Sequence, residues 1–274
     1  MKFTGERYLP EIQGTIYLEH YHRYYSIFHL VKDKRVLDIA CGEGYGSHLL
    51  ASHAKEVIGV DISAETIDFA KNKYKQAHLR FEQGSTSAIP IEDHSIDVVV
   101  SFETIEHHDQ HEQMMKEVKR VLAPGGLLII SSPDKHNYNK TLAKQNEFHV
   151  KELEFFEFKA LIRKHFAHSR FFYQKLVYGS LLCSEDDTSF RFISDKNQPS
   201  VYDAFQPIYD LAICSDAPFL GEVSSFFDGS KVSQKLIESK QNEIHAMQNS
   251  ITWKVGRFFL TPFSVFKKFA RRGN

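Results

Sequence analysis

The sequence predicts an α/β fold in which a parallel sheet is covered by helices on both faces. From residue 35 onward, short β-branched runs alternate with longer amphipathic segments, a pattern typical of strand–helix–strand units. The runs are apolar at almost every position, as expected for strands whose two faces are both buried. The length of 274 residues suits one large domain, or a domain with an appendage.

The strands are expected in order along the chain, at residues 35–40, 56–61, 78–84, 96–102, 126–133, 169–178 and 206–215. Helices are expected between and after them: one from a glycine-rich turn to about Ala54, and others at 63–74, 111–123, 151–166 and 233–250. Ser63 is a favourable N-cap for the second helix. The third helix has one apolar face and is expected to end at Pro124-Gly125-Gly126.

The chain is expected to have three parts: an N-terminal cap or lid at 1–30, a main domain at 31–216 with an insertion at about 179–206, and a helical extension at 217–274. The end of the extension differs from the rest in charge. Residues 254–274 hold six basic side chains and no acid, whereas the remaining residues carry 28 basic and 35 acidic groups. The aromatic, basic tail 252–274 predicts peripheral binding to an anionic membrane surface. Docking of this tail on the domain or on a partner subunit is the alternative.

Composition argues against several classes of protein. A net charge of −1 gives no general basis for nucleic-acid binding. The three cysteines lie far apart and suggest neither a disulfide framework nor a thiolate metal site. No stretch reaches the roughly 20 apolar residues of a membrane span, and the N-terminus has no signal-peptide pattern. We therefore expect a cytoplasmic protein, located at the inner face of the membrane if the tail binds lipid.

A glycine-rich loop between the first strand and the first helix carries the most information about a ligand. Its three glycines alternate with other residues: Gly42, Gly44 and Gly46. Such a loop lets a ligand approach the backbone closely. Asp38 precedes the loop inside the strand, which suits a ligand with a cationic amine and no pyrophosphate. Asp61 closes the next strand, where a carboxylate accepts hydrogen bonds from ribose hydroxyls. Without a ligand, the two acids would only cap the loop and solvate a strand end.

These motifs resemble those of the class I S-adenosylmethionine (SAM)-dependent methyltransferases of the type 11 group, over roughly residues 30–135. The resemblance implies a Rossmann-like, doubly wound sheet of seven strands, mostly parallel with the last strand antiparallel. It also implies SAM as the cofactor and S-adenosylhomocysteine as its product. Asp38 would face the methionine end of SAM, Asp61 would hold the ribose and Ile62 would pack on the adenine. The loop residues expected along the cofactor are Ala40, Gly42, Gly44 and Gly46.

Later motifs extend the resemblance. The segment QGSTSAIP matches the adenine-edge loop, and its expected contacts are Gly84, Ser85 and Thr86. The family commonly has an acid where this chain has Ser85, so we expect an altered adenine contact. The segment DVVVSFETIEHH matches the part that borders the transferred methyl group, with Phe102 and Glu103 as expected contacts. The segment 117–133 matches the helix and strand that follow.

The ends of the chain indicate an acceptor. Residues 3–25, 131–139 and 146–153 resemble methyltransferases of bacterial O-antigen and surface-polysaccharide gene clusters, and 249–263 resembles the endings of proteins from such clusters. This resemblance implies O-methylation of a sugar hydroxyl, on a sugar or a lipid-linked glycan. Two alternatives remain. One is methylation of a soluble sugar nucleotide or small metabolite at oxygen, nitrogen or carbon. The other is a non-catalytic SAM-binding partner of a glycosyltransferase.

Histidines are the candidates for removing a proton from a hydroxyl acceptor, because their pKa lies near neutrality. His107 follows the fourth predicted strand and His149 lies beyond the fifth, so both are candidate catalytic residues. A structural role is the alternative for each. Other histidines are expected in other positions. His20 and His22 could belong to the lid, and His108 and His111 are expected to be solvated or at a helix start. No spacing resembles a known metal motif, so no metal is predicted.

Overall fold

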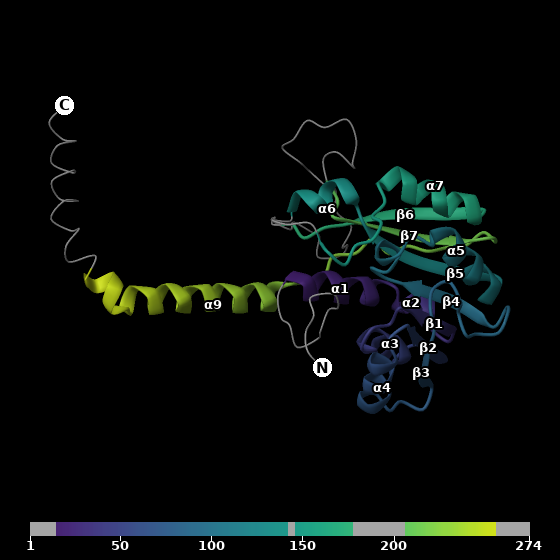
Figure 1. Cartoon of the computed structure of the whole chain (residues 1–274), viewed down its shortest axis with the longest axis horizontal. Helices are drawn as coiled ribbons and strands as arrows, with labels where there is room; N and C mark the ends of the chain where they lie inside the picture. The colour runs from purple at the N-terminus through teal and green to yellow at the C-terminus, as the bar shows by residue number, and fades with distance from the viewer. Residues whose placement is uncertain (1–14, 142–145, 178–205, 256–274) are drawn as a thin grey trace, which may run out of the picture. The chain divides into compact units, whose positions relative to one another are not determined.

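The computed structural model describes residues 15–141, 146–177 and 206–255 (Figure 1). The chain divides into two compact units. One contains Glu19–Phe226, and the other combines Gln13–Leu18 with Phe227–Asn274. Most of the predicted insertion (178–205) and most of the predicted membrane-binding tail (256–274) lie outside the described residues.

The first unit is built on a seven-stranded sheet with the order β3-β2-β1-β4-β5-β7-β6. All neighbouring pairs from β3 to β5 are parallel, and β7 runs antiparallel to both β5 and β6. The predicted doubly wound sheet with an antiparallel last strand is therefore confirmed. The strands are β1 (Arg35–Ile39), β2 (Glu56–Asp61), β3 (Leu79–Gln83), β4 (Ile96–Ser101), β5 (Leu122–Pro133), β6 (His168–Gln174) and β7 (Tyr209–Ser215).

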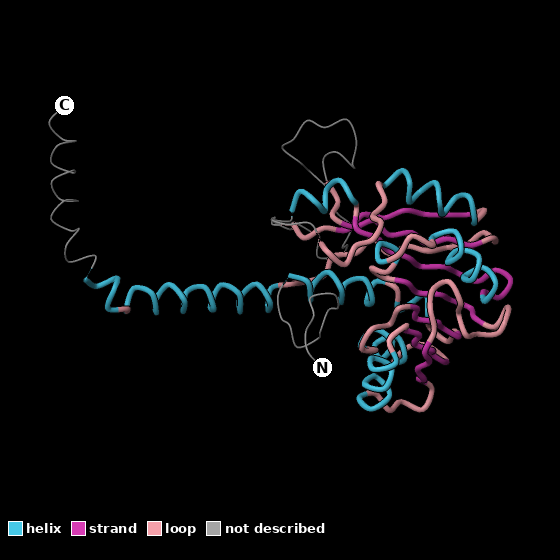
Figure 2. The backbone as a smooth tube through the Cα atoms, in the orientation of Figure 1, coloured by secondary structure: helices cyan, strands magenta, loops and turns pink. Residues whose placement is uncertain are grey.

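Helices flank the strands of this sheet, as the colouring by secondary structure shows (Figure 2). Those of the first unit are the later part of α1 (Thr15–Ser26), α2 (Phe28–Val31), α3 (Tyr45–Ala51), α4 (Ala64–Lys73), the short helix η1 (Ile105–His107), α5 (His111–Val121), α6 (Lys135–Thr141) and α7 (Phe155–His165). The Ser63 hydroxyl accepts the Thr66 backbone N–H at 3.3 Å, which confirms the predicted N-cap of α4.

The core lies between the sheet and the apolar faces of α5 and α7. The fully buried members of this cluster include Leu37, Val99, Leu128, Ile130, Met114, Met115, Val118, Val121, Phe158 and Ile162. Burying this continuous apolar surface is the main favourable contribution to folding of the unit. It also fixes the carboxyl ends of β1, β2, β4 and β5 at one edge of the sheet.

Several element boundaries differ from the sequence prediction, and two of these differences involve α5, β5 and α7. Helix α5 ends at Val121 and β5 begins directly at Leu122, so Pro124-Gly125-Gly126 lies within the strand and is not a loop after the helix. Helix α7 begins only at Phe155, because Glu154 and Glu157 form a capping box there. Helix α1 was predicted only as an unspecified cap.

The second unit contains the 20-residue helix α9 (Ser230–Asn249). Its apolar side chains Ile237, Ile244 and Met247 are about half exposed, at 57%, 48% and 51%. Among the described residues, no helix is both long enough and apolar enough to cross a membrane.

Candidate cofactor and acceptor site

The glycine-rich loop has two kinds of glycine. A Cβ on Gly44 would lie 2.6 Å from the Phe81 ring, and a Cβ on Gly46 would lie 2.1 Å from the Tyr24 ring. These two glycines are therefore required by packing. A Cβ on Gly42 would meet no atom of the described residues within 4 Å, although its φ of +54° is left-handed. Gly42 thus borders open space, as a loop that admits a ligand should.

Asp38 lies in β1 immediately before this loop, and its side chain is only 1% exposed. Its carboxylate accepts hydrogen bonds from the Ser47 hydroxyl at 2.6 Å and from the Tyr24 hydroxyl. Burial nevertheless raises the pKa of Asp38 to about 7. A cationic group placed beside Asp38 would lower this pKa, which fits the expected amine of a methionine moiety.

Asp61 ends β2 and connects that strand to the glycine-rich loop. Its Oδ2 accepts the Gly42 backbone N–H at 3.0 Å, and its Oδ1 accepts the Ser63 N–H at 2.9 Å. A carboxylate can accept several hydrogen bonds, and Asp61 lies at the strand end where ribose hydroxyls are expected. The neighbouring Ile62 is 68% exposed, which leaves an apolar surface at the position where an adenine is expected.

The predicted adenine-edge loop lies beside Asp61. The Gly84 N–H donates to the Asp61 carbonyl at 3.0 Å, and a Cβ on Gly84 would lie 2.4 Å from Pro90. Ser85 contacts Ser87 through their hydroxyls at 3.3 Å. The Thr86 hydroxyl lies 3.2 Å from the His108 Nε2. The Gly84 bond places the start of this loop at the end of β2, and the Thr86 contact places it beside η1.

Glu103 follows β4 and has a left-handed φ of 51°, which is a strained backbone conformation for a residue other than glycine. The Ser131 hydroxyl donates to Glu103 Oε1 at 2.6 Å and accepts the Glu103 N–H at 3.1 Å, so β5 holds this conformation. The preceding Phe102 packs edge-on against Tyr24, with ring centroids 5.1 Å apart. The structure thus places Phe102 and Glu103 next to helix α1.

Arg23 of helix α1 is a residue that the sequence analysis missed. It is 3% exposed, its Nη1 donates to Gln174 at 2.8 Å, and the same nitrogen lies 3.5 Å from Glu103 Oε1. Its Nε and Nη2 find no hydrogen-bond partner among the described residues. The guanidinium carbon also lies 4.7 Å from the centre of the Tyr209 ring. The only signal in the sequence is a single arginine within the aromatic run HYHRYY.

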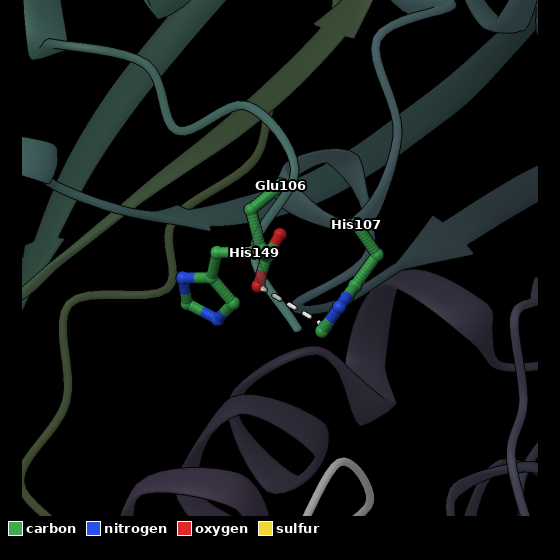
Figure 3. A group of neighbouring side chains, drawn as sticks. All are labelled: Glu106, His107 and His149. Carbon is green, nitrogen blue, oxygen red and sulfur yellow. Dashed lines mark ion pairs between the residues drawn. The ribbon is translucent and has the colours of Figure 1, made fainter. Parts of the chain in front are cut away.

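The two candidate catalytic histidines come together. His107 and His149 lie edge to face, with ring centroids 5.2 Å apart, and the side chain of Glu106 lies beside both (Figure 3). The His107 Nδ1 is 3.0 Å from the Phe148 carbonyl, and the His149 Nδ1 is 2.5 Å from Glu152 Oε1. We call Glu106, His107 and His149 the Glu–His–His cluster.

Glu106 is the member of this cluster that the sequence analysis did not select. It is 1% exposed, its Oε1 lies 3.9 Å from His107 Nε2, and its Oε2 has no hydrogen-bond partner among the described residues. Burial raises the pKa of Glu106 well above its ordinary value. Its backbone carbonyl accepts the N–H groups of Val150 and Lys151, at 2.8 and 3.0 Å. These bonds bring the segment that carries His149 to the end of β4.

The remaining histidines have other partners. His20 contacts the Tyr45 hydroxyl at 2.7 Å, and His22 contacts the Ser225 hydroxyl at 2.9 Å. Burial lowers the pKa of His108 to about 4. His111 starts α5, which is one of the two expected positions, and it is buried, with its Nε2 2.7 Å from the His108 carbonyl.

Comparison with known proteins bears directly on this edge of the sheet. Residues 37–130 match the family model described as a methyltransferase domain. This part of the chain is therefore similar to methyltransferase domains. It contains the glycine-rich loop, both aspartates, the adenine-edge loop and Glu106 with His107.

Relatives and a solved structure agree. A protein of Mycolicibacterium smegmatis named "Probable S-adenosylmethionine-dependent methyltransferase" is 34% identical over 165 residues, covering 59% of this chain and 63% of that protein. One of the same name from Mycobacterium tuberculosis is 32% identical, with 59% and 60% covered. The chain thus matches less than two thirds of the length of these relatives. A SAM-dependent methyltransferase structure from Thermotoga maritima aligns over 73% of this chain and 90% of its own, with a TM-score of 0.54 and 19% identity.

These comparisons confirm the predicted fold, the methyltransferase domain and SAM as the cofactor of such a domain. The predicted sugar acceptor, the surface-polysaccharide context, the residue roles and the membrane-binding tail stay predictions.

Proposed function

We propose that the protein transfers the methyl group of SAM to a sugar hydroxyl during the synthesis of a bacterial surface polysaccharide. One observation carries the methyl-transfer part of this proposal. The loop face at Gly42, where a Cβ would meet no atom of the described residues within 4 Å, is bordered by Asp61 and followed along the sheet edge by Glu103. These groups suit a ligand that combines a nucleoside with a cationic amino-acid moiety.

The residues have distinct roles in holding the cofactor. The Asp61 carboxylate would accept hydrogen bonds from the ribose hydroxyls. Asp38 and Glu103 would face the methionine ammonium. The Arg23 guanidinium has two buried nitrogens, Nε and Nη2, that lack a partner among the described residues. It is suited to the methionine carboxylate, because a buried donor without a partner is costly.

Bound SAM supplies a methyl group attached to a positively charged sulfur. The acceptor oxygen forms a bond to the methyl carbon while the carbon–sulfur bond breaks, leaving its electron pair on the sulfur of S-adenosylhomocysteine. The hydroxyl proton must leave as this bond forms. His107 and His149 follow β4 and β5 at the edge that carries the cofactor residues, so the Glu–His–His cluster is where the acceptor hydroxyl would be activated. Alignment of the acceptor oxygen with the methyl group would supply most of the remaining rate acceleration.

The acceptor class rests on the sequence segments outside the methyltransferase domain. The segment 146–153 supplies His149 and Glu152, and it lies against the end of β4 through the Glu106 carbonyl. The basic aromatic tail 252–274 supports an acceptor carried by a lipid at the cytoplasmic face of the membrane. A soluble sugar acceptor would make the tail a protein-docking element.

The test incubates the full chain and radiolabelled SAM with the membrane glycolipid fraction of the source organism and, separately, with its soluble sugar-nucleotide pool. Label in the lipid fraction that is lost on deleting 252–274 is the expected result. Label only in the soluble pool would move the activity to precursor synthesis. Absence of label from both fractions, with SAM binding intact, would contradict the proposal and favour a non-catalytic SAM-binding partner. Asp61→Ala, which should bind SAM much more weakly, serves as the negative control.

A further inference from the structure

The Glu–His–His cluster has the composition and geometry of a metal site. One ligand atom from each of Glu106, His107 and His149 lies within 4.8 Å of the other two, and the three side chains converge in the structure (Figure 3). We propose that these three residues bind one divalent transition-metal cation of the Zn²⁺ and Co²⁺ class.

The orientation of both imidazole rings supports this proposal. A histidine that binds a metal through one ring nitrogen usually donates the N–H of the other nitrogen to a carboxylate or a backbone carbonyl. Both arrangements occur here: the His149 Nδ1 faces Glu152 at 2.5 Å, and the His107 Nδ1 faces the Phe148 carbonyl at 3.0 Å. With the proton on Nδ1, the Nε2 of each ring is the nitrogen that can coordinate a cation. Glu152, at 8% exposure, is itself buried and can hold its histidine firmly.

The state of Glu106 is the second, independent observation. A carboxylate that is 1% exposed and has one oxygen without a hydrogen-bond partner is costly in a folded protein. The other oxygen, Oε1, lies 3.9 Å from the His107 Nε2, too far for a hydrogen bond. A cation between these atoms would bind the carboxylate oxygen and compensate its charge.

The donor set selects the class of cation. Two imidazole nitrogens and one carboxylate oxygen suit Zn²⁺, Co²⁺ or a related ion, whereas Mg²⁺ and Ca²⁺ prefer oxygen donors alone. Three protein ligands leave at least one coordination position open for a water or an acceptor oxygen. One contact must yield: the Asn146 side-chain amide nitrogen lies 3.0 Å from the His149 Nε2 and occupies the lone pair that the cation needs.

The role of the cation in the reaction rests on the proposed function, whereas its binding does not. A hydroxyl bound to the cation would have a lower pKa, so its proton could pass to solvent water as the oxygen attacks the methyl group. His107 and His149 would then act as ligands and not as the direct acceptors of that proton. Sequence spacing could not predict this site, because His149 reaches it from a distant segment.

The test titrates the metal-free full chain with Co²⁺, followed by its visible absorption bands, and with Zn²⁺ by calorimetry. We expect one cation per chain. Glu106→Gln and His149→Ala should each weaken binding by at least tenfold, and Glu152→Gln by roughly 10- to 100-fold. Asn146→Ala should bind several-fold more tightly, because it removes the competing donor. His165→Ala is the matched control: His165 also lies beside a carboxylate, Glu112 at 2.8 Å, but this carboxylate is about half exposed. This variant should bind as the wild type does.

SAM affinity, measured in the same samples, separates this inference from the proposed function. Loss of Co²⁺ binding in His149→Ala with unchanged SAM affinity would support the metal site. Equal Co²⁺ binding by wild type, Glu106→Gln and Asn146→Ala would overturn it, as would the absence of binding at millimolar Co²⁺. Full methyl transfer by chelator-treated protein would overturn the catalytic role and return His149 to the role of direct proton acceptor.

Discussion

The carboxylates at the two halves of the sheet edge differ in how fully their oxygens are hydrogen-bonded. At the ends of β1 and β2, Asp38 and Asp61 accept hydrogen bonds from side chains and backbone N–H groups of the fold itself. After β4, Glu106 is equally buried, but one of its oxygens has no partner among the described residues. In the first half, the fold itself orients the carboxylates before any ligand binds. In the second half, one buried carboxylate oxygen has no described partner, which supports the cation site proposed there.

The largest expected effect is on SAM binding, and it tests the half of the sheet edge at the ends of β1 and β2. Asp61→Ala should weaken SAM binding by about 10²- to 10⁴-fold, because hydrogen bonds to a charged acceptor contribute roughly 1.5–3 kcal/mol each. Calorimetric titration with SAM measures it. Glu106→Gln, in the other half, should change SAM affinity by less than threefold. Similar losses in both variants would break the distinction between the two halves.

The second expected effect concerns Asp38 and pH. Its folded-state pKa of about 7 lies above the ordinary value of 3.8, so the folded state binds the proton more tightly than the unfolded state does. Wild-type stability should therefore fall, relative to Asp38→Asn, as pH rises from about 4 to 7, and then level off. The total fall should be at most on the order of 4 kcal/mol.

Denaturant unfolding of both proteins at several pH values measures this difference. Bound SAM should flatten the curve, because its ammonium would stabilise the charged carboxylate. A difference that is independent of pH would show that Asp38 is ionised throughout, contrary to the interpretation given above.

The third effect tests Arg23. Arg23→Ala should weaken the binding of SAM by roughly 10- to 100-fold, the range of a charge-assisted hydrogen bond. Decarboxylated SAM, which lacks the group that Arg23 is proposed to contact, should bind the wild type and the variant with nearly equal affinity. Arg35→Ala, at a partly exposed ion pair with Asp97, is the control and should leave both affinities unchanged. An equal loss for both ligands would assign Arg23 a purely structural role.

The smallest effect separates the glycines of the loop. Gly46→Ala should destabilise the protein by about 1–3 kcal/mol, because its Cβ would overlap the Tyr24 ring. Gly42→Ala should lower the stability by only about 1–2 kcal/mol, through backbone strain. It should nevertheless weaken SAM binding under conditions where the variant is fully folded. Thermal unfolding and SAM titration of the two variants give the comparison. It fails if Gly46→Ala is the more stable of the two.

The sequence predicted the first half of the edge well and the second half poorly, for a physical reason. Asp38, Asp61 and the glycines lie on adjacent strand–loop units, so their positions follow from local pattern and from the parallel sheet. Glu106, Arg23 and Glu152 acquire their roles through contacts between distant segments. The Glu106 carbonyl, for example, holds the segment of His149, and no spacing in the sequence reveals that bond. The start of β5 at Leu122 was missed because Pro124-Gly125-Gly126 looks locally like a loop.

The position of Tyr24 has a kinetic consequence. Its ring covers Gly46, and its hydroxyl donates to Asp38, so one side chain of helix α1 contacts both the glycine-rich loop and the strand that precedes it. The same helix turn carries Arg23, proposed to hold the methionine carboxylate. Departure of S-adenosylhomocysteine would then require this turn to move, and product release would set the turnover rate. Under that condition a pre-steady-state burst of methylated product precedes the slower steady state.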